Sequence, residues 1–399
     1  MDPIELPTKR APGSLFDPPP ELGALRERCP VAPLAYPDGH VGWLVTGHAA
    51  ARQVLSDPRF SNRPELRHVP VAEYRPDDGA EPDHTPEEAL PGWFVNMDRP
   101  EHTCYRRLLS RHFTAHRLAA LNPAIEEVVA AQLKVLAAAG PGADLMAGFA
   151  IPVATIVTCD LLGVPYDDHP AFQRDTQTVV DLDSPKEEAG RAFAALSGYL
   201  HGLVTGDRPG GLIGELRAEL TAEELTNIAL LLLVAGHEPT ANMLGLGVLA
   251  LLTHPAQLAA LRADPSLAGN ATDELMRYAT VPHQGAPNRT ALEDVEVEGV
   301  LVRAGQAVTL SLPAANRDPR VFADPDTLRL DRAEARQHLG FGHGLHLCIG
   351  QQLARVVVRI ALVRLFEAFP GLALAVPAAE VPLRDHSTNR GVRELRVTF

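Results

Sequence analysis

The sequence predicts a mainly α-helical protein with a small β region. Between Pro100 and Asp264 the chain is a succession of apolar patterns at helical spacing, broken by proline and glycine. Two short apolar runs, Leu34–Tyr36 and Val41–Val45, flank a turn sequence and predict a pair of strands. Alternating valines on both sides of Glu298-Gly299 predict a second hairpin. Strand signals are therefore few, and helical signals fill the middle of the chain.

The individual elements follow from local patterns. A helix is predicted over His48–Leu55, and a long surface loop over Ser61–Gly92, which is polar and has no period. Thr221-Ala-Glu-Glu224 is a capping box, and it predicts that the longest helix begins there and ends near Thr253, before a proline. A further helix is predicted around Asp273–Tyr278.

Charge and cysteine content exclude several classes of protein. The net charge of −14 argues against nucleic acid as a partner, because nucleic-acid-binding proteins usually carry a basic surface. The four cysteines are widely separated, without a CxxC pair or a secretory leader, so we expect reduced thiols and a cytoplasmic setting. The most apolar segment, Ile228–Leu252, is interrupted by polar residues, so we expect no membrane span.

The run Phe341–Gly350 is the most informative part of the chain. It places three glycines, two histidines and Cys348 directly before an apolar helical pattern that Pro370 ends. Gly344 allows a turn that a side chain would hinder, and Gly350 allows the start of the helix to approach a flat ligand. Because Cys348 lies at a helix N-terminus, we expect its pKa to be lowered and its thiolate to be available as a metal ligand.

Phe341, Gly344, Cys348 and Gly350 form the pattern Phe-x-x-Gly-x-x-x-Cys-x-Gly, which resembles the haem-binding signature of the cytochromes P450. The resemblance extends from about Gly42 to the C-terminus. It implies the P450 fold, a triangular helical prism enclosing haem b, with Cys348 as axial thiolate ligand. It also implies one domain over residues 21–399, after a proline-rich N-terminal arm of residues 1–20.

Other residues match further positions of the family. His102 and Arg106, four residues apart on one helix face, with Arg289 and His346, are expected to bind the haem carboxylates. Ala235 is expected beside the haem. Glu274 and Arg277 match the family's ExxR pair, and Arg332 is expected to complete a buried network with them, with Arg336 as the alternative.

The sequence Ala235-Gly236-His-Glu238-Pro239-Thr240 resembles the oxygen-activation motif of the family, but Pro239 occupies the usual threonine position. Gly236 and Glu238 are kept, and Thr240 lies about 100° further round the helix. Proline removes an N–H group, so the helix is expected to kink or widen. Either Pro239 only fixes this kink, or protons arrive through ordered water or a substrate group with Glu238 as the acid.

The resemblance implies an oxidoreductase that uses O2 and two electrons to hydroxylate or epoxidise a natural product in bacterial specialised metabolism. The expected electron donors are a ferredoxin and an NAD(P)H-dependent ferredoxin reductase, recruited by basic residues such as Arg107 and Arg111. Alternatives are oxidative carbon-carbon or carbon-nitrogen coupling of aromatic substrates such as cyclic dipeptides, and a haem sensor or electron carrier. Peroxygenase chemistry ranks lower, because Glu238 would repel a substrate carboxylate.

By resemblance, four segments are expected to face the substrate and to suit a medium-sized, hydrogen-bonding small molecule. They are Ser61–Phe94, Val234–Pro239, Val281–Pro287 and His386–Asn389. The protein is expected to be monomeric.

Overall fold

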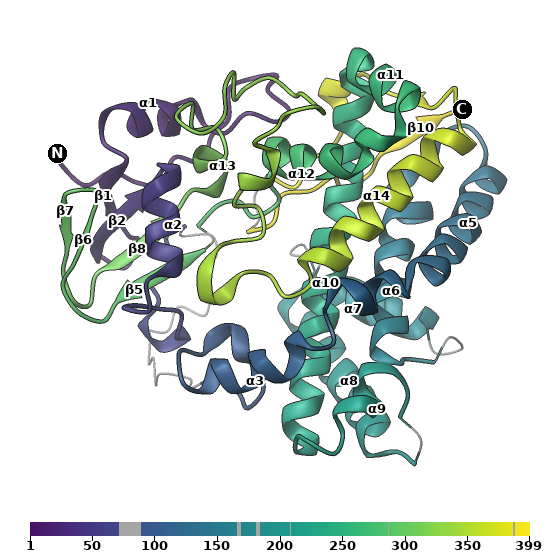
Figure 1. Cartoon of the computed structure of the whole chain (residues 1–399), viewed down its shortest axis with the longest axis horizontal. Coiled ribbons are helices and arrows are strands. Elements are labelled where there is room, and N and C mark those ends of the chain that lie inside the picture. Colours follow the sequence, from purple (N-terminus) through teal and green to yellow (C-terminus); the bar gives the residue numbers. More distant parts are fainter. Residues whose placement is uncertain (72–88, 166–168, 181–183, 208, 286, 386–387) are drawn as a thin grey trace.

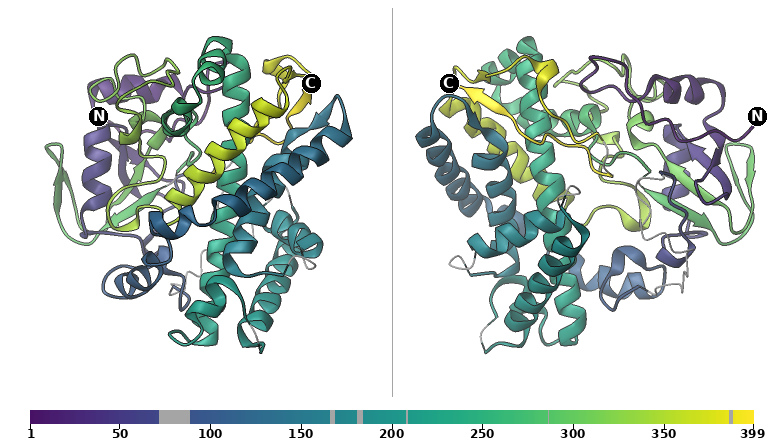
Figure 2. Two further views of the ribbon diagram at one scale, coloured as in Figure 1. Left: turned by 45° about the vertical axis from the view of Figure 1, so that its right-hand side comes forward. Right: turned by 180° about the vertical axis from the view of Figure 1, so that it is seen from behind.

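The protein is described by a computed structural model, which covers residues 1–71, 89–165, 169–180, 184–207, 209–285, 287–385 and 388–399. Helices form most of it; strands β1, β2, β5, β6, β7 and β8 gather at one end, near the N-terminus, whereas β10 lies near the C-terminus (Figure 1). The C-terminus lies at the opposite, helical end (Figure 2). The predicted mainly α fold with a small β region is therefore confirmed.

The longest helix, α10 (Ala222–Thr253), lies at the centre of the helical part and contacts helices on several sides. Its capping box is present as predicted: the Thr221 side chain accepts from the Glu224 backbone, and the Glu224 carboxylate accepts from the Thr221 backbone. Because α10 is apolar on most of its circumference, it is buried among its neighbours rather than lying on the surface. Those neighbours include α6 (Ile151–Leu162), α8 (Lys186–Thr205), α12 (Ala268–Ala279) and α14 (Gln351–Ala368), which crosses α10 diagonally (Figure 1).

The remaining helices surround this centre or border the sheets. They are α1 (Pro20–Arg28), α2 (His48–Ser56), α3 (Glu101–Ser110), α4 (Ala115–Ala119), α5 (Asn122–Ala139), α7 (His169–Val180), α9 (Gly211–Leu216), α11 (Pro255–Ala263) and α13 (Leu312–Ala315). A π-helical turn, Met146–Ala150, leads into α6. The helices predicted over His48–Leu55 and around Asp273–Tyr278 correspond to α2 and α12.

The largest sheet has the strand order β1-β2-β8-β5-β3, with β2 and β8 parallel and the other pairs antiparallel. Its strands are β1 (Val31–Ala35), β2 (Val41–Val45), β8 (Ala307–Leu310), β5 (Asn288–Ala291) and β3 (Phe60–Ser61). A three-stranded sheet contains β4 (Ala143–Asp144), β10 (Arg396–Thr398) and β9 (Ala373–Leu374). The predicted hairpin is β6 (Val295–Val297) and β7 (Val300–Val302), and Glu298 and Gly299 both have positive φ, as its tight turn requires.

Two predicted boundaries were wrong. The first strand is Val31–Ala35 rather than Leu34–Tyr36, because it pairs along its whole length with Val41–Val45. The segment predicted as a loop begins with the end of β3, which pairs with β5, and contains a short 3-10 helix, Pro64–Leu66. Residues 72–88 of that segment lie outside the described residues.

The N-terminal residues pack against the rest of the protein. Ile4 exchanges backbone hydrogen bonds with Pro33 and Ala35 beside β1, and Phe16 is buried against the ring of Tyr278 at 5.3 Å between centroids. The division into an arm of residues 1–20 and one domain of residues 21–399 remains a prediction.

Within the described part of the chain, α10 is long and apolar enough to cross a membrane by length and composition. The polar residues near its middle, which led us to expect no membrane span, do not keep the helix below this criterion, because hydropathy is averaged over a window. Of that apolar window, 67% is buried inside the protein, as in the core helix of a globular protein.

Candidate functional site

A cavity of about 350 Å³ lies between α10, α14 and the loop that carries Cys348. Its wall is mostly apolar. The predicted site residues that line it are Ala235, Gly236, Pro239, Thr240, Arg289, Phe341, His346, Cys348 and Gly350. The cavity therefore brings together residues from the middle of the chain and from the cysteine loop, more than a hundred positions apart in the sequence.

The cysteine loop has the backbone that its glycines predict. Gly344 has a φ of 69°, and a side chain there would place its Cβ 2.3 Å from the carbonyl oxygen of Leu55 in α2. The Cys348 N–H donates to the Phe341 carbonyl at 2.9 Å, which closes the loop, and α14 begins directly after Gly350. The loop is thus held in a fixed shape that presents the sulfur to the cavity.

The prediction that the pKa of Cys348 is lowered was wrong. Burial raises the pKa of this thiol, and it outweighs the opposing effects of the Gly350 backbone N–H and of the Arg106 and Arg355 charges. The start of α14 does favour the thiolate, but less than burial disfavours it. A metal ion at the sulfur would reverse this balance, because a coordinating thiol is deprotonated.

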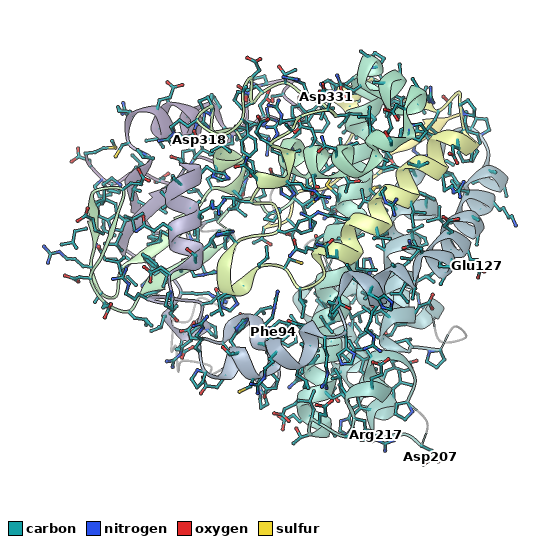
Figure 3. All side chains as sticks on the ribbon, viewed as in Figure 1. Phe94, Glu127, Asp207, Arg217, Asp318 and Asp331 are labelled. Carbon is teal, nitrogen blue, oxygen red and sulfur yellow. The ribbon has the colours of Figure 1, made fainter. Side chains whose placement is uncertain are left out.

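Four basic side chains come together at the edge of the cavity. His102 and Arg106 lie on α3, and the ring of His102 packs 4.3 Å from that of His346 between centroids. The ring of Phe94, labelled near α3 in Figure 3, lies 6.2 Å from that of His102 between centroids. Both ring nitrogens of the buried His102 lack a hydrogen-bond partner, and among the described residues none of the four makes an ion pair.

The basic groups lower one another's pKa values. Burial and then the charge of Arg106 lower the pKa of His102 to about 4. Burial and then Arg289 lower the pKa of His346 to about 3. Burial and then Arg67 lower the pKa of Arg289 to about 10. Such a cluster of unpaired basic groups fits an anionic partner, and the two carboxylates of a haem have the required charge.

Arg67 is a member of this cluster that sequence reasoning missed. It follows the 3-10 helix Pro64–Leu66 and donates to the Asn96 side chain at 2.6 Å, and its charge acts on both Arg289 and His346. Asn62 also contributes, because its side-chain oxygen accepts from Arg289 at 2.7 Å. No motif marks these residues, since their partners lie far away in the sequence.

Glu274 and two arginines form a fully buried network. Arg277 donates two hydrogen bonds to the Glu274 carboxylate at 2.7 and 2.8 Å, and Arg332 Nε lies 3.1 Å from both carboxylate oxygens. The second arginine is thus Arg332, whereas Arg336 contacts Asp273 and its side chain is 78% exposed. None of the three residues is among those that line the cavity, and both arginines also donate to backbone carbonyls between Asn316 and Thr327, which fixes that segment against α12.

The wall formed by α10 differs from the expectation in one respect. Ala235, Gly236, Pro239 and Thr240 line the cavity, but Glu238 is not among the described lining residues. Its carboxylate accepts hydrogen bonds from Asn242 at 3.2 Å and Asn389 at 3.1 Å. Burial raises the pKa of Glu238 despite these donors. The helix remains α-helical across Pro239.

Gly236 packs closely against α6. A side chain there would place its Cβ 3.0 Å from the Thr158 hydroxyl oxygen, so the Thr158 side chain would have to move by a few tenths of an ångström. The segments expected to face the substrate contribute Val281, Pro282, Pro287 and Asn389 to the wall. Residues 286 and 386–387 of these segments lie outside the described residues.

The basic residues Arg107, Arg111, His112 and Arg117 form a second group at the protein surface, and it is partly neutralised by glutamates. Arg111 pairs with Glu219, and Arg117 and His112 both contact Glu215, at 2.9 and 2.7 Å. Arg107 is exposed and makes no ion pair with a described residue. Arg107 is therefore the better candidate for contact with an acidic partner, and the assignment of Arg107 and Arg111 to docking stays a prediction.

Comparisons with known proteins agree with this geometry. The family described as "Cytochrome P450" matches residues 212–374. The chain is 45% identical over 390 residues to cytochrome P450 105C1 of Streptomyces sp, covering 96% of each protein. It is 43% identical over 394 residues to pentalenic acid synthase of Streptomyces avermitilis, covering 96% of this chain and 95% of that protein. The crystal structure of CYP105P1 in complex with filipin I superposes with a TM-score of 0.89 at 36% identity, covering 100% and 99% of the two chains.

Proposed function

The chain belongs to the cytochrome P450 family, and from this we propose that it is an oxygen-dependent monooxygenase that hydroxylates or epoxidises a natural product in bacterial specialised metabolism. Membership makes the protein an oxidoreductase of the P450 fold, with haem b and a cysteine thiolate axial ligand. What we propose beyond this is the type of reaction, hydroxylation or epoxidation, and the role of each site residue.

The observation that carries the proposal is the shared cavity. The sulfur of Cys348 and the α10 residues Gly236, Pro239 and Thr240 line one space. At its edge lie four basic groups that make no ion pair with any described residue. In this arrangement Cys348 would bind the iron, and His102, Arg106, Arg289 and His346 would bind the carboxylates. When bound, a haem with a thiolate ligand supplies activation of dioxygen, with insertion of one oxygen atom into the substrate.

The chain's own residues bind and orient the substrate and exclude water. The cavity wall is mostly apolar, with the Thr158 and Thr240 hydroxyls and the Asn389 amide as dispersed polar groups. This composition suits a medium-sized molecule that makes a few hydrogen bonds. Relatives named for such chemistry include pentalenic acid synthase and, at 43% identity, nocardicin C N-oxygenase of Nocardia uniformis.

Pro239 has neither a backbone N–H nor a polar side chain, so it cannot pass a proton to the cavity. Protons must therefore reach the cavity through other groups. We assign the acid to Glu238, whose raised pKa favours a bound proton, although its carboxylate lies behind the cavity wall. Asn389 donates a hydrogen bond to Glu238 and also lines the cavity. Thr240 supplies the hydroxyl group of the Ala235–Thr240 motif, and it lines the cavity too. Ordered water or a substrate group would complete the route.

Bacterial P450s generally take electrons from a ferredoxin and its reductase and bind small-molecule substrates. We assign the same partners to this chain, as a cytoplasmic monomer, with Arg107 on the surface of α3 contributing to ferredoxin docking. The formal charge of −14 makes this local basic site the more important for attracting an acidic partner.

Two measurements test the proposal. The reduced, carbon monoxide-bound protein should show the red-shifted Soret band of a haem thiolate, and Cys348→Ser should abolish it, whereas Cys104→Ser, at an exposed cysteine, should not. Retention of the band by Cys348→Ser would contradict the ligand assignment.

With a ferredoxin, its reductase and NAD(P)H, a panel of terpenoid, macrolide and cyclic dipeptide compounds should yield products heavier by one oxygen atom. Mass spectrometry identifies them. Products that have lost two hydrogen atoms and gained a new bond would show coupling instead. Spectral shifts without substrate-dependent NAD(P)H consumption would indicate a sensor.

A further inference from the structure

Helix α12 carries two adjacent buried carboxylates that bind different parts of the protein. Glu274 pairs with Arg277 and Arg332, as described above. Asp273, one residue earlier, points to another set of partners on the side of the cysteine loop. Glu274 belongs to the buried network with Arg277 and Arg332, whereas Asp273 has no role so far, although the Asp273 side chain is also fully buried.

Asp273 is bound to three basic groups. Its Oδ1 accepts from Arg355 Nε at 2.6 Å and lies 3.3 Å from His338 Nε2. Its Oδ2 accepts from Arg336 Nε at 3.3 Å. The Arg336 side chain is 78% exposed, so the interaction with Arg355, whose side chain is 19% exposed, is the stronger of the two arginine pairs.

Both inner partners of Asp273 contact the cysteine loop. The guanidinium of Arg355 lies over the ring of Phe341 at 4.6 Å and donates to the Gln351 side chain at 2.8 Å. On the other side, His338 Nδ1 accepts from the Gly340 N–H at 3.0 Å, and its ring lies 5.5 Å from that of Phe341. His338 Nδ1 accepts, so the neutral ring carries its proton on Nε2 and donates it to Asp273.

A backbone hydrogen bond connects Phe341 to the residue that carries the sulfur. The carbonyl of Phe341 accepts the hydrogen bond from the Cys348 N–H at 2.9 Å. Phe341 is therefore held by Arg355 on its ring and by Cys348 on its carbonyl. Displacement of Arg355 would release the start of the loop whose end carries the sulfur.

We propose that Asp273 is a positioning residue for the thiolate: it holds Arg355 over Phe341 and balances the Arg355 charge near the Cys348 sulfur. This inference rests on the proposed ligation of haem iron by Cys348. It is distinct from the ExxR network, because the ion pairs of Asp273 among the described residues are with Arg336, His338 and Arg355, and not with Arg277 or Arg332.

The two charges act on the sulfur in opposite directions. The positive charge of Arg355 favours negative charge on the Cys348 sulfur, since its guanidinium lies over Phe341, whose carbonyl accepts from the Cys348 N–H. Asp273 offsets part of this charge. Replacing Asp273 by a neutral residue should leave Arg355 uncompensated, weaken electron donation by the sulfur and make the iron easier to reduce. Replacing Arg355 should do the reverse.

The test uses the holoenzyme with haem and measures the reduction potential of the iron by spectroelectrochemistry. We expect Asp273→Asn to shift the potential upward and Arg355→Gln to shift it downward relative to the parent. Asp273→Glu and Arg355→Lys keep the charges and should remain close to the parent. Arg336→Gln is the matched control, since it removes an exposed arginine from the same carboxylate, and it should cause little shift.

A second measurement tests whether Asp273 and Arg355 hold the cysteine loop in position. In the reduced carbon monoxide complex, Asp273→Asn and Arg355→Gln should lose the red-shifted Soret band several-fold faster than the parent and Arg336→Gln. Shifts of potential with the same sign in Asp273→Asn and Arg355→Gln, or no shift in either, would overturn the proposal. A parent protein that lacks the band would instead contradict ligation by Cys348, so the two failures are distinguishable.

Discussion

The side-chain amide of Asn389 donates a hydrogen bond to the Glu238 carboxylate, with 3.1 Å between Nδ2 and Oε2. This bond joins the C-terminal segment to the middle of α10, and Arg384 lies 3.8 Å from the other carboxylate oxygen. Asn389 lines the cavity and Glu238 does not. The Glu238 carboxylate is therefore linked to the cavity by the side chain of Asn389 rather than by direct exposure.

We expect Glu238→Gln to slow turnover by roughly 100-fold, the low end of what a positioned acid contributes. Glutamine cannot supply a proton, and its NH2 group would face one of the two asparagine donors. Turnover is measured as product formed per minute with saturating ferredoxin. Glu238→Asp, which keeps the acid, is the control. Full activity of Glu238→Gln would place the proton source elsewhere.

Pro239→Thr adds a hydroxyl to the cavity wall and restores an N–H group to α10. Haem binding should stay intact, and a smaller share of NAD(P)H should be lost as peroxide, because an additional donor lies near the reacting atoms. The ratio of product to NAD(P)H consumed measures this. An unchanged ratio, together with full activity of Glu238→Gln, would mean that Pro239 only shapes the helix.

The buried ExxR network should be important for stability. Arg332→Ala leaves the buried Glu274 with one of its two arginine partners and should lower the free energy of unfolding by about 3 kcal/mol, the low end for a broken buried ion pair. Arg336→Ala removes an exposed arginine and should cost about 0–1 kcal/mol. Urea unfolding followed by circular dichroism compares the two. Equal losses would contradict the assignment of Arg332.

Arg107→Glu should slow reduction by the ferredoxin roughly 3- to 10-fold at low salt and flatten its salt dependence, because electrostatic steering accelerates association. Arg111 is already paired with Glu219, so Arg111→Glu should have the smaller effect on docking. Stopped-flow reduction at several ionic strengths provides the measurement. If Arg107→Glu kept parental kinetics at every salt concentration, docking would use another surface.

His237 should make folding sensitive to acid. Burial lowers its pKa from 6.5 to about 4, so the unfolded chain binds a proton first as the pH falls. The stability contribution is complete above pH 6.5 and is lost as the pH falls toward 4. At pH 5, about 1.5 units below the ordinary pKa, the free energy of unfolding should be lower by about 2 kcal/mol, since one pKa unit corresponds to about 1.36 kcal/mol.

His237→Gln keeps a hydrogen-bonding side chain beside Thr155, which contacts the histidine at 3.2 Å. Its urea midpoint should therefore fall less between pH 7 and 5 than that of the parent. Parallel pH profiles for the two proteins would show that His237 does not titrate during unfolding.

Local chemistry made several features predictable from the sequence by itself. The turn glycines, the cysteine and the start of the next helix are contiguous, so Phe341–Gly350 could be read as a ligand loop before its surroundings were known. The capping box at Thr221 likewise sets the start of α10 through hydrogen bonds within four residues. Strand ends were less predictable, because β1 takes its length from pairing with β2.

Only the tertiary structure decided which of two nearby arginines pairs with Glu274. Arg332 and Arg336 are four residues apart and both can reach α12, but packing buries one and exposes the other. It also added Arg67 to the basic cluster and turned Glu238 away from the cavity. The pKa of Cys348 rises instead of falling for the same reason. Burial and long-range charge depend on what surrounds a residue in space, and a sequence motif carries only its neighbours along the chain.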